Sequence, residues 1–205
     1  MEYKEQTFNI PEVEGISKKT IDEHLKLYAG YVKHANIITA TIAEMNKYTG
    51  PDMPMPAGTI YAINEMRRRF SFEFNGMRNH EYYFEQLEGG PSMGNPESAL
   101  AQQMKKDFGS AEVWFEEFKN ICLTRGIGWA ILYYDKKTDS LVNAWVDEQH
   151  LGQLNGLDFI YGVDMWEHSY YLDYTPAEKK KYVESYLLAT NQDVVEKRFE
   201  KIKNS

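Results

Sequence analysis

The spacing of hydrophobic positions predicts two long helices in the first part of the chain. Over residues 17–46, apolar side chains recur three or four positions apart, and a second run of this kind ends near Glu88. Thr20 with Glu23 three residues later predicts a capping box at the first helix. The segment 49–58, TGPDMPMPAG, is typical of a loop. Two long helices joined by a short loop predict an antiparallel helical hairpin.

The second part of the chain combines strand patterns with shorter helices. The runs GWAILYYD and SLVNAWV around the turn residues KKTD predict a β-hairpin, and FIYGV at 159–163 predicts a third strand. Further helix starts are predicted at Asn95-Pro96, Ser110, Thr175-Pro176 and Asp193. The predicted fold class is therefore α+β. An N-terminal α-hairpin domain, residues 1–90, packs on a C-terminal α/β part, residues 91–205, with a three-stranded antiparallel sheet.

Composition narrows the range of partners. The net charge of −8, from 31 acidic against 23 basic residues, disfavours nucleic acid or an anionic membrane surface as a partner. No apolar run approaches the ~20 residues of a membrane span, and the first residues lack the pattern of a secretory signal or transit peptide. The single cysteine, Cys122, excludes an intrachain disulfide. We therefore expect a cytoplasmic protein.

The stretch 163–171, VDMWEHSYY, is the strongest candidate for chemistry. Asp164 and His168 are four residues apart, so a helical turn would direct both at one point. His24 and His80 each fall in the apolar stripe of one predicted helix, where a lone histidine is more often a core residue. Facing stripes would, however, bring the two together. Three imidazoles and one carboxylate suit iron or manganese, and the lack of thiolates disfavours structural zinc.

The chain resembles the iron/manganese superoxide dismutases over nearly its whole length. The residues that carry the resemblance are Asp164-x-Trp166-Glu167-His168-x-Tyr170-Tyr171, Asn79-His80, the stretch GIGWA at 126–130, and Tyr31-Val32. The resemblance implies an oxidoreductase that converts superoxide to oxygen and hydrogen peroxide in a ping-pong cycle. It also implies one manganese or iron ion per chain. The implied ligands are His24, His80, Asp164 and His168.

The resemblance also implies roles for residues around the metal. Tyr31 and Gln149 would form the hydrogen-bond chain to a solvent ligand of the ion. Trp129, Trp166 and Phe84 would wall the site and exclude water. Plain core packing is the alternative interpretation of these aromatic residues, and the two interpretations are compatible.

A homodimer is a further implication of the resemblance. In the family, the glutamate at the position of Glu167 reaches the ligand histidine of the other chain, here His168 of the partner subunit. An unpaired carboxylate between a core tryptophan and a ligand histidine would be costly to desolvate, which agrees with such pairing. Tyr171 and Tyr28 are the other expected interface residues.

The chain departs from the family pattern in three places. His24 and Tyr31 are seven residues apart, where most relatives have eight; seven residues return a helix to within about 20° of the same face. Relatives have a channel histidine between these two, for which Leu27 and Tyr28 are the candidates here, with Tyr28 favoured. Relatives also carry an arginine near the channel mouth. Lys179 is the candidate replacement, and a solvated helix face is its alternative interpretation.

The predicted metal preference depends on where the amide next to the metal comes from. Gln149 follows the second predicted strand, as in manganese-type relatives, whereas many iron-type relatives have a glutamine at the position of Gly76. A one-residue shift would instead place His150 there, but Gly162, two residues before Asp164, is also manganese-like. We therefore predict that the manganese form is the more active. The alternatives are an iron-preferring or cambialistic dismutase and an inactive dismutase-like binding protein.

Overall fold

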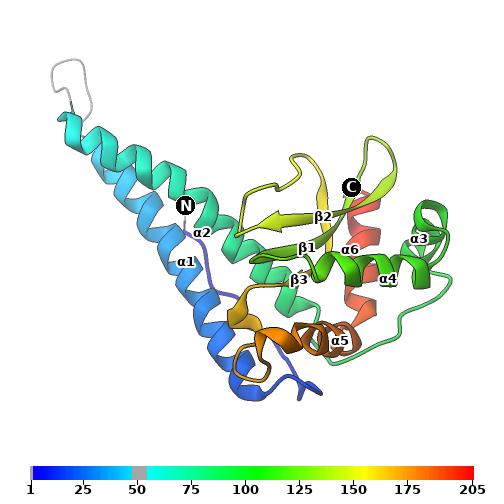
Figure 1. The fold of residues 1–205 in the computed structure, drawn as a ribbon. Coiled ribbons are helices and arrows are strands. Elements are labelled where there is room, and N and C mark those ends of the chain that lie inside the picture. The colour runs from blue at the N-terminus through cyan, green and yellow to red at the C-terminus, as the bar shows by residue number, and fades with distance from the viewer. Residues whose placement is uncertain (1, 48–54) are drawn as a thin grey trace.

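The N-terminal part of the protein is a hairpin of two long helices (Figure 1). In the computed structural model, which describes residues 2–47 and 55–205, α1 spans Lys18–Asn46 and α2 spans Ala57–Glu85, with 29 residues in each. The predicted α-hairpin is therefore confirmed. The predicted loop at 49–58 lies mostly outside the described residues.

Local capping explains where the helices begin. The hydroxyl of Ser17 accepts a hydrogen bond from the backbone N–H of Thr20 and caps α1. The predicted cap at Thr20 is wrong, because its hydroxyl instead donates to Asp173 Oδ2 at 2.6 Å and ties α1 to the C-terminal part. Ser110 caps its helix as predicted. The last helix is capped by Asn191 and not by Asp193.

The sheet has three antiparallel strands in the order β2-β1-β3. The strands are β1 (Gly128–Asp135), β2 (Ser140–Asp147) and β3 (Asp158–Asp164). All three were predicted, and the fold class is confirmed. In the register of the central strand β1, Trp129 lies opposite Asp164. The sheet therefore places a large aromatic side chain next to the carboxylate at the end of β3.

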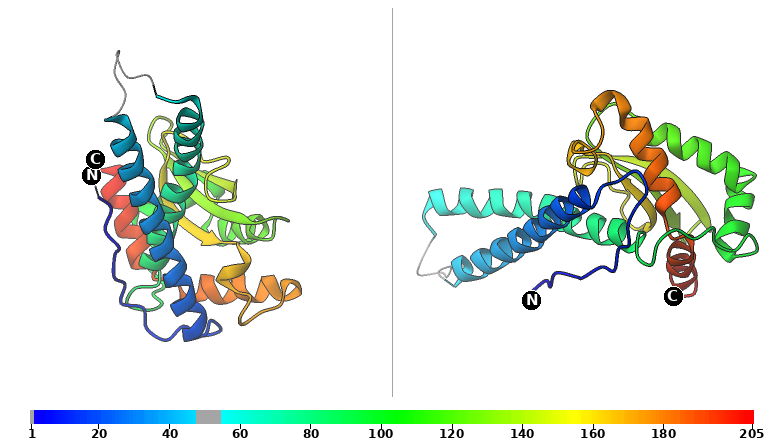
Figure 2. Two further views of the ribbon diagram at one scale, coloured as in Figure 1. Left: turned by 90° about the vertical axis from the view of Figure 1, so that its left-hand side faces the viewer. Right: turned by 90° about the horizontal axis from the view of Figure 1, so that it is seen from below.

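Helices pack around the sheet and join it to the hairpin. They are α3 (Ala99–Phe108), α4 (Ala111–Cys122), α5 (Lys179–Ala189) and α6 (Gln192–Lys203), with the 3₁₀ turns η1 (Glu167–Ser169) and η2 (Pro176–Glu178). Helix α4 packs on β1 and β2, while α2 and α6 pack on β3. Seen from below in Figure 2, the hairpin projects from the side of the sheet part. Only the end that holds the start of α1 and the end of α2 is packed against the sheet part.

One hydrophobic core spans the junction between the two parts. Phe84 of α2, Trp129 of β1 and Met165 after β3 are all fully buried within it. Burial of large side chains at this junction stabilises the packing of hairpin on sheet. Polar side chains are also buried at this junction, among them His24, His80, Gln149 and Asp164. Among the described residues, no helix is long and apolar enough to cross a lipid bilayer.

Candidate metal centre

Four side chains from four different elements converge where the hairpin meets the sheet. His24 comes from α1, His80 from α2, Asp164 from the end of β3 and His168 from η1. One candidate ligand atom from each lies within 4.8 Å of the others. Asp164 Oδ2 is at the centre, 3.1 Å from His24 Nε2, 3.3 Å from His80 Nε2 and 3.0 Å from His168 Nε2. The structure thus brings together the whole predicted ligand set.

The backbone around Asp164 holds its carboxylate in one orientation. Oδ1 accepts a hydrogen bond from the Trp166 backbone N–H at 2.8 Å, which leaves Oδ2 to face the histidines. The Asp164 carbonyl accepts hydrogen bonds from Ser169 Oγ at 3.0 Å and from Tyr182 Oη at 2.8 Å. The turn that returns His168 to the centre is the short 3₁₀ turn η1. Tyr182 was not predicted at the site, because only the packing of α5 brings its hydroxyl to Asp164.

Electrostatics favour an ionised Asp164 and neutral imidazoles at His24 and His80. Burial alone would raise the pKa of Asp164, but the charge and hydrogen bonds of His168 and His24 outweigh it and hold this pKa below its usual range. Burial lowers the pKa of His24 against the opposing effect of Asp164. Burial and the nearby His24 lower the pKa of His80 well below its usual value. Neutral imidazoles present lone pairs, which metal ligation requires.

His80 shows most directly that the site fits a metal ion. Its Nδ1 donates to the Gly76 carbonyl at 2.6 Å, so the lone pair of the neutral ring is on Nε2. This Nε2 is buried and makes no hydrogen bond, although Asp164 Oδ2 lies 3.3 Å away. A buried acceptor without a partner is costly, and a cation at the centre of the four side chains would satisfy it. Imidazole nitrogens and a carboxylate are donors that suit iron and manganese.

The side chain of Gln149 is fixed by two hydrogen bonds beside the four residues. Its Nε2 donates to Tyr31 Oη at 3.0 Å, and its Oε1 accepts from Trp129 Nε1 at 2.8 Å. Gln149 and Trp129 are completely buried. The expected contact between Gln149 and Tyr31 is confirmed. Together the three side chains connect the strand part of the site to α1.

Because Gly76 has no side chain, the Tyr31 ring can lie directly against α2 at this position. A Cβ atom built at Gly76 would lie 2.6 Å from Tyr31 Cδ1 and 2.7 Å from Cε1, closer than real contacts allow. A glutamine at position 76 is therefore incompatible with this position of Tyr31. The amide beside the metal centre comes from Gln149 instead.

A second layer of polar residues holds the backbone of Gln149. Its carbonyl accepts hydrogen bonds from Asn79 Nδ2 at 3.2 Å and from Gln153 Nε2 at 3.3 Å. Tyr133 Oη donates in turn to Gln153 Oε1. Asn79 precedes the ligand His80, so its involvement could have been inferred from the sequence. Gln153 and Tyr133 carry no such signal, because only the sheet register and the loop after β2 bring them here.

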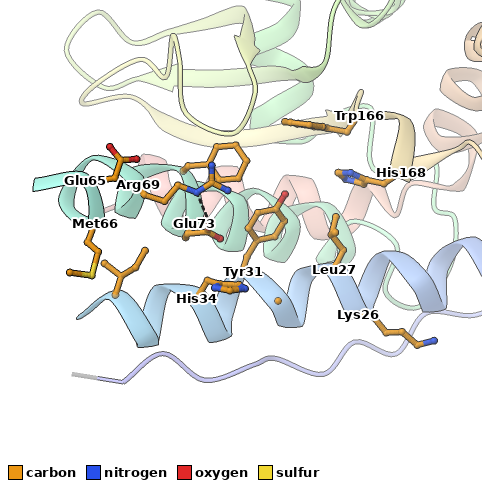
Figure 3. Close-up of a pocket in the computed structure, with 13 residues that line it drawn as sticks. Lys26, Leu27, Tyr31, His34, Glu65, Met66, Arg69, Glu73, Trp166 and His168 are labelled. Carbon is orange, nitrogen blue, oxygen red and sulfur yellow. Dashed lines mark hydrogen bonds and ion pairs between the residues drawn. The ribbon is translucent and has the colours of Figure 1, made fainter. Parts of the chain in front are cut away.

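A pocket of about 830 Å³ leads from the surface to His168 (Figure 3). Tyr31 and Trp166 line it along with His168. Trp166 is held in place because its Nε1 donates to the Glu148 carbonyl at 3.1 Å. The remaining lining comes mainly from α1 and α2. The pocket therefore opens His168 to the surface along the hairpin.

Comparison with known proteins agrees with this geometry. The sequence profile of the iron/manganese superoxide dismutases, C-terminal domain, matches residues 96–198. An iron superoxide dismutase of Cupriavidus metallidurans is 36% identical over 84% of this chain and 83% of its own length. The chain belongs to the iron/manganese superoxide dismutase family.

Relatives named as iron enzymes and relatives named as manganese enzymes are similar to this chain to about the same degree. An iron superoxide dismutase of Aquifex aeolicus is 32% identical over 92% of this chain and 86% of its own length. A manganese superoxide dismutase of Haloferax volcanii is 34% identical over 84% of this chain and 81% of its own length. Sequence similarity therefore does not distinguish manganese from iron.

Two residues expected at the channel lie elsewhere. Tyr28 is completely buried, and its hydroxyl donates to Glu81 Oε1 at 3.2 Å, so the side chain reaches neither the pocket nor the surface. Leu27 lines the pocket in its place. Lys179 does not line the pocket either, because its Nζ donates to the Thr124 carbonyl at 3.1 Å. The expectations for Tyr28 and Lys179 therefore do not agree with the structure.

The other expected interface residues are exposed. Tyr171 is 58% exposed and Glu167 is exposed beside it on the surface around η1. Within one chain, the Glu167 carboxylate is therefore solvated, and its desolvation cost arises only if another chain covers it.

Proposed function

We propose that this member of the family is a superoxide dismutase that holds one manganese or iron ion between His24, His80, Asp164 and His168. The convergence of these side chains on Asp164 Oδ2 is the observation that carries the proposal. When bound, such an ion supplies one-electron chemistry, in which one superoxide is oxidised to oxygen and another is reduced, with two protons, to hydrogen peroxide. An inactive dismutase-like protein would be expected to have lost ligands, and all four are present.

The aromatic residues separate the centre from bulk water. Trp129 and Phe84 are completely buried beside the ligands, with the Trp129 ring centroid 5.1 Å from that of His80. The Trp166 ring stacks on His168 with centroids 5.7 Å apart. In these dry surroundings, the charge of Asp164 acts strongly on any ion held by the histidines.

Tyr31 and Gln149 are placed to deliver protons from the pocket. The Tyr31 hydroxyl oxygen accepts from Gln149, so its own hydrogen remains free to be donated. Burial raises the pKa of Tyr31, so the phenol keeps its proton at neutral pH. The Gln149 amide has a second N–H, and we predict that it donates to a solvent ligand of the ion.

We propose that the manganese form is the more active one. The support is local: Gln149 supplies the buried amide, while the Tyr31 ring excludes a side chain at Gly76. A tightly held amide tunes the potential of the ion and thereby determines which metal can cycle. The test is to load the protein with each metal separately and to compare activity per bound ion. An iron form several-fold faster than the manganese form would overturn this proposal.

A homodimer is the proposed assembly. Glu167 and Tyr171 are exposed, and the side chain of His168 is 21% exposed, so a second chain could bring its glutamate to this ligand. Each centre would then depend on Glu167 of the partner subunit. Domains of residues 1–90 and 91–205, a cytoplasmic location, and the lack of nucleic-acid and membrane partners also stay predictions. Fractionation of the source cells would test the location.

A further inference from the structure

We propose that Arg69 guides superoxide into the pocket and takes the role for which Lys179 was the candidate. The inference rests on the proposed function, because it requires an anionic substrate. Arg69 lies on α2 and lines the same pocket as Tyr31 and His168, as Figure 3 shows. Lys179 lies outside that lining.

The packing of Arg69 orients its charge toward the pocket. Its guanidinium lies 3.8 Å from the centroid of the Phe72 ring, and its Nε donates to Glu73 Oε1 at 2.8 Å. The side chain of Arg69 is 48% exposed, whereas that of Glu73 is 8% exposed. Both ends of this ion pair line the pocket, but the positive end is the exposed one and the negative end is mostly buried.

The charge balance shows why this cation matters. The chain carries a net charge of −8, which repels an anion at long range. The described lining residues include two basic side chains, Lys26 and Arg69, and two acidic side chains, Glu65 and Glu73. Formal charges in the lining cancel only while Arg69 is present, and its loss leaves the pocket negative.

Lys26 is a weaker candidate for this role. Its side chain is 70% exposed and its Nζ binds Glu23 Oε1 at 2.7 Å, so its charge is solvated and locally paired. Arg69 also lines the pocket but is less exposed, at 48%, and its charge, like that of Glu73, acts on Tyr31. Solvent therefore screens the field of Arg69 less than that of Lys26.

A series of charge variants of the metal-loaded protein tests the inference. The variants Arg69→Gln, Glu73→Gln and the double variant change the pocket charge by −1, +1 and 0. We expect kcat/KM for superoxide at low salt to fall roughly three- to tenfold in Arg69→Gln, to rise in Glu73→Gln, and to return toward wild type in the double variant. The differences should shrink as salt is raised. The affinity of the oxidised metal for azide, followed by absorbance, should keep the same order.

Matched controls separate this inference from its alternatives. Arg67→Gln and Lys179→Gln remove the same charge outside the pocket lining and should leave azide affinity near that of wild type. Arg69→Lys keeps the charge and should restore most of the function lost in Arg69→Gln. Equal azide affinities in Arg69→Gln and Arg67→Gln would overturn the inference. So would a parallel loss in Arg69→Gln and Glu73→Gln, which would indicate a purely structural ion pair. A wild-type protein that binds azide but lacks dismutase activity would instead contradict the proposed function.

Discussion

The helical hairpin and the sheet part supply two candidate ligands each, but they hold them differently. His24 and His80 project from long packed helices and are almost completely buried. Asp164 ends a strand that pairs with the central strand of the sheet. His168 follows on a short 3₁₀ turn and lines the pocket. The hairpin thus fixes two ligands by packing, while the sheet part supplies the charge and the ligand nearest the solvent.

The two parts also divide the surroundings of the centre. The pocket is lined mostly by α1 and α2, so the hairpin determines access and local charge. The hydrogen bonds that fix Gln149 come from both parts: Trp129 and Gln153 belong to the sheet part, whereas Tyr31 and Asn79 belong to the hairpin. Changes on the two sides should therefore have different consequences.

The largest effect is expected where the sheet part supplies its carboxylate. Asp164→Ala removes the acceptor on which three histidines converge. Because the loss of even an outer partner of a ligand costs roughly 10–100-fold, we expect activity to fall by more than about a hundredfold, with loss of the ion. Metal analysis and a dismutase assay measure both. Circular dichroism should still show an α-rich fold, because the core lies mainly outside the site.

Asp193→Ala is the matched control for this change. Asp193 is exposed at the start of α6 and belongs neither to the four candidate ligands nor to the pocket lining. The Asp193→Ala variant should keep wild-type metal content and activity. Full dismutase activity in Asp164→Ala would contradict the assignment of the metal centre.

An intermediate effect is expected on the hairpin side, at Gly76→Ala. The added Cβ would overlap the Tyr31 ring, and overpacking of this kind typically costs about 1–3 kcal/mol. We expect a lower free energy of unfolding, measured by denaturant titration, and lower activity because Tyr31 must move away from Gln149. The control is Gly58→Ala on the same helix, where a Cβ meets nothing within 4 Å. Equal stability of the two variants would show that the Tyr31 ring is not held against Gly76.

The smallest effect on activity is expected at the exposed surface of the sheet part. Glu167→Ala removes one charged hydrogen bond at each of the two centres, and at about 1.5 kcal/mol each this should weaken the homodimer roughly a hundredfold. Activity should fall with dimer content. Sedimentation across a concentration series measures the dimer, and exposed Glu200→Ala serves as control. A wild-type protein that stays monomeric at micromolar concentration would contradict the dimer.

The sequence predicted the parts of the fold and site that depend on regular spacing. Helical periodicity identified the α-hairpin, and alternation with turn residues identified the strands. His24 and His80 were recognised because each interrupts an apolar stripe that faces the other helix. Asp164 and His168 were recognised by their short spacing in a distinctive motif.

The errors concern side-chain direction and long-range contacts. Tyr28 and Leu27 are neighbours in sequence, but adjacent helix positions point about 100° apart, and the pocket lies on the side of Leu27. Lys179 was the candidate replacement for the channel arginine of relatives, whereas its Nζ binds a carbonyl of the segment after α4. Arg69 was not recognised, because only the packing of α2 against α1 shows that it faces the pocket.

The most direct test of the central claim is to locate the metal in crystals of the active protein. Anomalous scattering measured above and below the manganese and iron absorption edges identifies the ion and its position together. We predict one ion per chain, bonded to Nε2 of His24, His80 and His168 and to a carboxylate oxygen of Asp164. An ion bound elsewhere in active protein, or a centre without manganese or iron in active protein, would contradict it.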